Sequence, residues 1–155
     1  MAETLYQTVN FHFSVKFSLP SDIEKKLADI SFQSVTGLDT TVETEPIKEG
    51  GENRFEHTIP LRIRSGPITL KRGLLKPEHS GITKWMKRAF NNVQVQPLKE
   101  VVIKLLDENH EPLMVWVATN VWPRSWKMGE LNAERGEVLI ETLELNCNTI
   151  TFKDA

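Results

Sequence analysis

Hydrophobic and polar residues alternate along several stretches of the chain, which is the pattern of β-strands with one buried face. In residues 11–18 every second residue is Phe or Val, and the residues between them are polar. Residues 101–107, 113–122 and 137–147 are rich in aliphatic residues and predict three further strands. The sequence Asp-Glu-Asn at 107–109 suits a tight turn, so the first two of these three strands should pair antiparallel.

Two glycine positions divide the segment that follows the first strand. Residues 31–46 are rich in Thr and Val but contain Gly37, which predicts a strand, a bend and a second strand. In residues 47–64 the pair Gly50 and Gly51 lies between polar flanks, and apolar residues return after it. We therefore expect a long hairpin or protruding loop, over about residues 43–56, with the glycines at its tip.

One stretch has the period of a helix. Over about residues 78–91, apolar residues recur three and four positions apart, with lysines and an arginine on the other side. Pro77 and Ser80 mark the start of this helix, and the pair Asn91 and Asn92 marks its end. The chain has 155 residues and contains no repeat or linker, so residues 1–155 should form one β-rich domain with one flanking helix.

The four tryptophans have different expected roles. Trp85 falls on the apolar side of the helix and Trp116 on a strand, so both should pack in the core. Pro123 is expected to end the strand that begins near residue 113 and to leave Trp126 outside it. Trp122 and Trp126 then either close the end of the core or anchor an interface.

Composition and charge exclude several classes of function. With 39% hydrophobic and 26% charged residues the chain reads as soluble and globular, and no apolar run approaches the roughly 18 residues of a membrane span. The N-terminus lacks a secretory signal, which indicates synthesis in the cytoplasm. The net charge is −2 with no basic block, so we expect no sequence-specific binding of nucleic acid. The single Cys147 excludes a disulfide within the chain.

No pattern of catalytic or metal-binding residues is present. The histidines at 12, 57, 79 and 110 lie in different expected elements, and neither a nucleophile motif nor a phosphate-binding glycine loop occurs. Glu43 and Glu45 would share one face of a strand, as carboxylates on solvated sheets do. We therefore predict no enzyme, no catalytic residue, no metal and no cofactor. A monomeric ligand-binding β-barrel and an enzyme of unfamiliar type stay as alternatives.

The order of several short motifs resembles a known family. In the first half these motifs are "FSVKF", "SVTGLD" at 34–39, "EGGEN" at 49–53 and "ITLKRGL" at 68–74. In the second half they are the helix with Trp85, "VVIKLLDE", "WPRSWKMGELNA" and "GEVLIETLEL". Together they resemble the tail tube proteins of contractile phages and the inner tube proteins of extracellular contractile injection systems. The resemblance spans nearly the whole chain.

This resemblance implies an antiparallel β-barrel or sandwich with a flanking helix, six copies of which close into a ring. Each copy would give four strands to a continuous inner barrel of about 24 strands. Stacked rings would form a hollow tube that sheath contraction propels and that conducts or carries protein cargo. The implied partners are the chain itself, the sheath protein, the baseplate or spike, and a tube cap, within a phage tail or tail-like particle. An initiator paralogue that joins the tube to the baseplate is the alternative within the family.

The same resemblance suggests which residues lie at contacts between copies. Trp122 and Trp126 would seal the barrel end between rings, and an acidic hairpin would pair with basic groups of a neighbouring copy. A polar lumen wall would come from the last predicted strand, whose polar residues have a solvated outer face as their alternative location. The interface candidates are Glu43, Glu45, Glu49, Gly50, Gly51, Glu52, Lys71, Arg72, Trp122 and Trp126, and the lumen candidates are Glu141, Glu144, Asn146 and Asn148.

Overall fold

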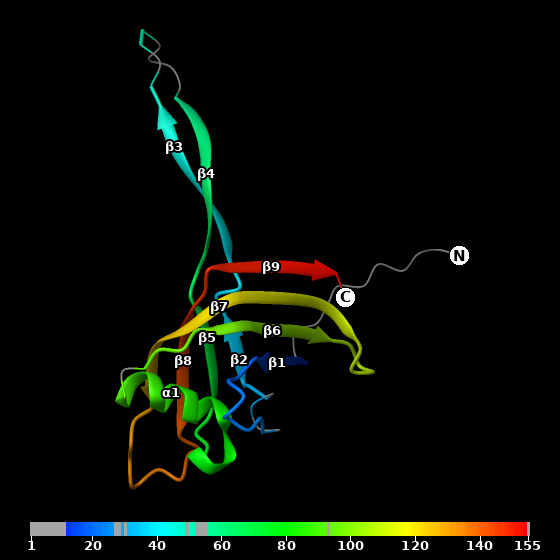
Figure 1. Cartoon of the computed structure of the whole chain (residues 1–155), viewed down its shortest axis with the longest axis vertical. Coiled ribbons are helices and arrows are strands. Elements are labelled where there is room, and N and C mark those ends of the chain that lie inside the picture. Colours follow the sequence, from blue (N-terminus) through cyan, green and yellow to red (C-terminus); the bar gives the residue numbers. More distant parts are fainter. Residues whose placement is uncertain are drawn as a thin grey trace, which may run out of the picture.

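The computed structural model describes residues 12–26, 29, 31–48, 50–51, 56–92 and 94–154. Within these ranges the fold is mainly antiparallel β with one α-helix, as the sequence predicts (Figure 1). The elements are β1 (Phe13–Phe17), β2 (Ser34–Thr36), β3 (Thr40–Ile47), β4 (His57–Ser65), β5 (Ile68–Gly73), the 3-10 turn η2 (Pro77–His79), α1 (Gly81–Asn91), β6 (Leu98–Leu106), β7 (Pro112–Met128), β8 (Ile140–Asn146) and β9 (Thr149–Asp154).

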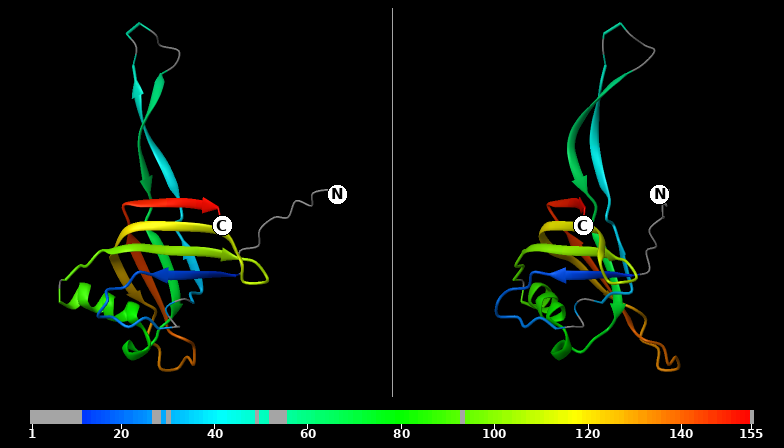
Figure 2. Two further views of the ribbon diagram at one scale, coloured as in Figure 1. Left: turned by 45° about the vertical axis from the view of Figure 1, so that its right-hand side comes forward. Right: turned by 90° about the vertical axis from the view of Figure 1, so that its right-hand side faces the viewer.

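The long strand β7 belongs to two layers. Its residues 112–121 pair with β6, and β9 pairs with the same half of β7 on the other side. Its residues 122–128 pair with β8 instead, with a register shift between Pro123 and Ser125. Sheet 1 is therefore β1, β6, the first half of β7 and β9, and sheet 2 is the second half of β7 with β8, β5 and β2. The strands of the two sheets run crosswise (Figures 1 and 2).

The core lies between the two sheets and α1. Strand residues such as Val15, Ile103 and Leu143 are buried there together with Trp85 of the helix. Each such side chain contributes about 1.5–3 kcal/mol when fully buried. The hydroxyl of Ser80 caps α1 by accepting a hydrogen bond from the Thr83 N–H at 3.2 Å. A helix is thus present where the sequence predicts one, but it starts at Gly81 and not at 78, because the extended Ser80 (φ −142°, ψ 122°) separates α1 from the short turn η2.

Strands β3 and β4 form a separate two-stranded hairpin that projects away from the two sheets (Figure 1). Gly37 makes the bend between β2 and β3 at φ +86°, and a Cβ there would lie 1.9 Å from the carbonyl oxygen of Pro67. Only glycine fits this turn without movement of the backbone. The predicted strand, bend, strand and hairpin are confirmed, although the paired hairpin starts at Thr40 and ends at Ser65.

Two other predictions have clear outcomes. The turn at 107–109 joins antiparallel β6 and β7, and Asp107 Oδ1 accepts from the N–H groups of Asn109 and Glu111 at 2.8 and 2.9 Å. The prediction that Pro123 ends its strand is wrong. A bulge lies at Pro123, so the strand ladder does not need the N–H that proline lacks. Strand β7 therefore continues, and Trp126 pairs with Leu143.

Candidate functional site

Sheet 1 has one open edge at β1. The carbonyl of His12 and the N–H of Ser18 both bond to β6, which places the main-chain groups of the even-numbered residues toward β6. The groups of Phe13, Val15 and Phe17 therefore point away from the sheet. Among the residues that the structure describes, none of these three N–H groups has a hydrogen-bond acceptor. Such a row of unpaired groups is a template for another strand.

The opposite edge of sheet 1, at β9, is also open. The N–H of Ile150 points outward and donates to Ser65 Oγ at 3.1 Å, so the hydroxyl of Ser65 satisfies the first group of this edge. By the period of two, the groups of Phe152 and Asp154 point the same way. Within the described part of the chain, these two N–H groups have no acceptor. The side chain of Phe152 is 54% exposed beside this edge.

The strand directions in sheet 1 make its two edges compatible. Each of the pairs β1–β6, β6–β7 and β7–β9 is antiparallel, so β1 and β9 run in opposite directions. A β1 strand placed against the β9 edge of another copy can therefore continue the same antiparallel pattern. Sheet 2 ends on β2, which has only three residues. Sheet 1 thus offers the longer pair of edges for extension.

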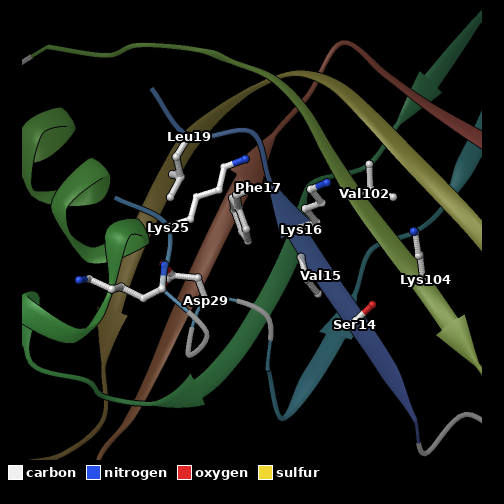
Figure 3. A pocket seen from close by; sticks show the side chains of 10 residues that line it. Ser14, Val15, Lys16, Phe17, Leu19, Lys25, Asp29, Val102 and Lys104 are labelled. Carbon is white, nitrogen blue, oxygen red and sulfur yellow. The ribbon is translucent and has the colours of Figure 1, made fainter. Parts of the chain in front are cut away.

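A cavity of about 240 Å³ runs along the open edge of β1 (Figure 3). Residues from both faces of β1 line it, and Leu19, Lys25 and Asp29 line it from the segment that follows (Figure 3). Lys16 and Lys104 add positive charge on the side of the cavity that faces away from the core. The surface beside β1 is therefore concave and partly apolar.

The projecting hairpin exposes apolar side chains. Leu61 is 55% and Ile63 is 67% exposed, and Val42, Ile47 and Ile59 are also exposed on β3 and β4. A two-stranded hairpin without a packed face is marginally stable in water by itself. Contiguous exposed apolar residues of this kind mark a surface that contacts another molecule.

Glu43 forms ion pairs within this hairpin. Its carboxylate pairs with Arg62 Nε at 2.6 Å and with Arg64. The hydrogen bond from Arg62 holds the pKa of Glu43 below its ordinary value. The predicted acidic residue thus has cationic partners within its own chain. Glu45 is exposed nearby.

The hairpin tip contains two further predicted residues of this group. Gly50 and Gly51 lie in the turn, where Gly51 has a φ of +95°. Glu49 and Glu52 lie outside the described residues. Whether the tip contacts another copy therefore stays a prediction.

Arg72 occupies the centre of a buried polar cluster. Its guanidinium pairs with Glu141 and donates to Ser80 Oγ at 2.7 Å, while Ser80 donates to Asp29 at 2.6 Å. The second carboxylate oxygen of Asp29 accepts the N–H of Gly81 at 2.9 Å. The cluster joins sheet 2 to the start of α1 through charges that all have partners.

This burial corrects two predicted roles. Arg72 is 3% exposed and Glu141 is completely buried, so Arg72 is not available to pair with another copy and Glu141 does not line a lumen. The sequence pattern missed this because a charged residue on a strand is normally on the solvated face. Lys71, the neighbour of Arg72, is exposed on the opposite face of β5 and stays an interface candidate.

Trp126 belongs to the same buried cluster. Its indole N–H donates to Glu141 Oε2 at 2.9 Å, and its ring packs against the core. Trp122 is half-buried and pairs with Asn146 between β7 and β8. The ring of Trp126 therefore serves the core of its own chain, and sealing between rings by Trp122 and Trp126 stays a prediction.

The other predicted lumen residues lie on or beside sheet 2. Glu144 is half-buried and accepts from Lys127 Nζ at 3.1 Å, which lowers the pKa of this carboxyl. Asn146 ends β8, and Asn148 is exposed in the turn to β9. That Glu144, Asn146 and Asn148 line a lumen therefore stays a prediction.

The described residues contain no group of three or more His, Cys, Asp or Glu side chains placed to hold a metal ion. No helix in the described ranges is long and apolar enough to cross a membrane. Cys147 is half-buried, and burial raises the pKa of its thiol. The notable features of the surface are thus two sheet edges and an apolar hairpin.

Comparisons with known proteins agree with this architecture. Residues 9–151 match the family model described as T4-like virus tail tube protein gp19. A chain in the anti-feeding prophage (AFP) baseplate structure is 30% identical, with 99% of this chain and 98% of that chain covered and a TM-score of 0.82. Comparison with curated proteins finds no match.

Two further structures share the fold at lower identity. A chain of the PVC sheath-tube complex, from an extracellular contractile injection system in the extended state, is 22% identical over 97% of this chain and 93% of that chain, with a TM-score of 0.77. A chain of the AFP tube-terminating cap is 22% identical over 100% and 96%, with a TM-score of 0.78. The match of residues 9–151 and the 30% identity establish that the chain belongs to the T4-like virus tail tube protein gp19 family and is a structural tube component of a phage tail or contractile injection system.

Proposed function

We propose that six copies of this chain close into a ring through sheet 1, and that the rings stack into a hollow tube. The observation that carries this proposal is the pair of open edges at β1 and β9. Because these strands run in opposite directions, every copy in the ring adds to its neighbour in the same antiparallel way. The AFP baseplate structure, one chain of which is 30% identical to this chain, is 6-fold symmetrised.

Edge pairing also gives the cavity and the hairpin a role. A β9 strand from a neighbouring copy would lie along the cavity beside β1 and would cover its apolar part. The hairpin projects from the β9 side of sheet 1, where the neighbour on the other side would join through its own β1 (Figure 1). Its exposed Leu61 and Ile63 would then pack on the neighbour. A head-to-tail contact of this kind closes a ring, and a second one along the axis builds the tube.

The tube would work as a rigid conduit inside a contractile sheath. Sheath contraction would drive it through a target envelope, with protein cargo inside or at its tip. This role requires no covalent chemistry from the chain, and we assign it no enzymatic activity. Its partners would be the sheath protein, the baseplate or spike and the tube cap, and we place its synthesis in the cytoplasm.

Replacing one outward N–H tests the edge contact. In Phe152→Pro the lost N–H points away from β7, so the fold should persist while pairing across copies is weakened. Phe152→Ala is the matched control, because it removes the same side chain and keeps the N–H. Negative-stain imaging over a concentration range should show rings for the wild type and Phe152→Ala but single copies for Phe152→Pro. Thermal unfolding checks that both variants fold.

Two results would contradict the proposed ring. The first is a wild-type chain that stays monomeric at high concentration. The second is Phe152→Pro forming rings as readily as Phe152→Ala, which would show that the β9 edge is not used.

A tube initiator is the second candidate. The 30% identity is to a chain in a baseplate structure, whereas the chains in the sheath-tube and cap structures are each 22% identical. An initiator would form rings that do not stack on copies of themselves. Stacked tubes in the same images would instead support the shaft.

A further inference from the structure

The two faces of sheet 1 differ sharply in chemistry. On the core face, the register across the sheet aligns apolar rows, such as Val15, Ile103, Trp116 and Phe152. On the other face the aligned rows are mixed. The first is Ser14, Lys104, Val115 and Lys153, the second is Lys16, Val102, Val117 and Thr151, and the third is Glu100, Thr119 and Thr149.

This second face, which we call the lysine face, carries an excess of positive charge. Lys16, Lys104 and Lys153 stand against the single carboxylate of Glu100. Lys16 and Lys153 are exposed and Lys104 is half-buried. In the described part of the chain, none of the three lysines forms an ion pair. The excess is notable because the whole chain has a net charge of −2.

The position of the lysine face follows from the proposed ring. Sheet 2 and α1 cover the core face of sheet 1, so the bulk of each copy lies on that side (Figure 2). A closed barrel of sheet 1 strands has room for this bulk only on its outside. The lysine face would then form the inner wall, and six copies would repeat its charge around the lumen.

The residues between the lysines indicate the kind of molecule that fits. Val102 and Val115, which are half-buried, supply short apolar contacts, and the three rows contain neither an aromatic side chain nor an arginine. Binding of single-stranded nucleic acid commonly uses aromatic side chains that stack on bases. Acidic peptide segments need only lysines for their carboxylates and aliphatic surface for their methylenes.

We propose that the lysine face is a binding surface for an acidic polypeptide segment held in the lumen of the tube. This inference rests on the proposed ring, and it names the class of its occupant. The binding would be weak for each contact and repeated around the ring, as suits a segment that is retained and later released.

A labelled polyglutamate peptide is the probe for this surface. Fluorescence anisotropy would measure its binding to rings already seen by negative stain, at rising salt concentration. The test variant carries Lys16→Gln, Lys104→Gln and Lys153→Gln. The matched control carries the same change at Lys76, Lys84 and Lys87. All three are exposed, Lys76 directly before η2 and the other two on α1. If the triple variant does not form rings, Lys104→Glu alone serves, because β6 lies between β1 and β7 inside sheet 1.

We expect wild-type rings to bind the peptide, and added salt to weaken that binding. The test variant should bind at least about tenfold more weakly than the wild type, since several ion pairs are lost together. The affinity of the control should stay within about twofold of the wild type. Equal weakening of the test and control variants, no binding by wild-type rings, or tighter binding of an oligonucleotide of the same charge would each overturn the inference and leave the ring intact. A chain that forms no rings would instead overturn the proposed function and, with it, this lumen surface.

Discussion

Replacement of Arg72 by Met should strongly destabilise the fold. Arg72 is the only cation within the cluster formed by Asp29, Glu141, Ser80 and Thr83 in the described structure, and all of these groups are buried. Met fills similar space but leaves both carboxylates without their cation. Asp29 would retain the Ser80 hydroxyl and the Gly81 N–H, whereas among the described residues Glu141 would retain only the indole of Trp126. Glu141 therefore bears most of the cost.

The size of the effect follows from general values for buried ion pairs. Removing one partner of such a pair costs about 3–5 kcal/mol, which is a large part of the roughly 5–15 kcal/mol that holds a domain folded. The midpoint of urea unfolding should fall by about 1–3 M. Adding Glu141→Gln to Arg72→Met removes the orphaned charge and should recover at least about 1 kcal/mol.

Urea unfolding followed by tryptophan fluorescence is the assay. It is best done in the Phe152→Pro background, so that assembly does not contribute to the measured stability. Lys71→Met is the matched control, since Lys71 is the exposed neighbour of Arg72 on β5. This control should change the free energy of unfolding by no more than about 0.5 kcal/mol. A loss below about 1 kcal/mol for Arg72→Met, or no recovery in the double variant, would refute this account of the cluster.

Two further predictions concern the hairpin and its base. Gly37→Ala should lower the free energy of unfolding by about 1–3 kcal/mol or more, because φ is +86° and a Cβ would lie 1.9 Å from the Pro67 carbonyl oxygen. An unchanged melting temperature would contradict this. Glu43 has a pKa lowered from 4.5 by the hydrogen bond from Arg62, so its stabilisation of the hairpin should be present above pH 4.5 and lost as the pH falls through the lower folded value. A carbon-13 NMR titration of the Glu43 carboxyl checks this, and a midpoint at or above 4.5 would be the contrary result.

Local patterns in the sequence were sufficient for much of the fold. Alternation at 11–18 predicted β1, the helical period predicted α1, and Gly37 with Gly50 and Gly51 predicted the bend and the hairpin tip. These features depend on neighbouring residues alone. Strand β9 was missed although Ile150 and Phe152 alternate with Thr151 and Lys153, a signal that was available in the sequence.

The errors at the candidate site have a different cause. Arg72 and Glu141 are 69 residues apart and become buried only because two strands and a helix meet around them. No local pattern distinguishes such a pair from charges on a solvated face. The open edges could not be located either, because an edge is defined by which strands lie side by side in the folded chain. The order β1-β6-β7 with β9 became known only from the structure.

Amide hydrogen exchange is the most direct test of pairing between copies. The N–H groups of Phe13, Val15 and Phe17 point out of sheet 1, whereas those of Ser14 and Lys16 point toward β6 and serve as internal references. The account predicts that the three outward amides exchange slowly in assembled rings and rapidly in monomeric Phe152→Pro, while the two inward amides are protected in both. Outward amides that exchange equally fast in rings and monomers would contradict it.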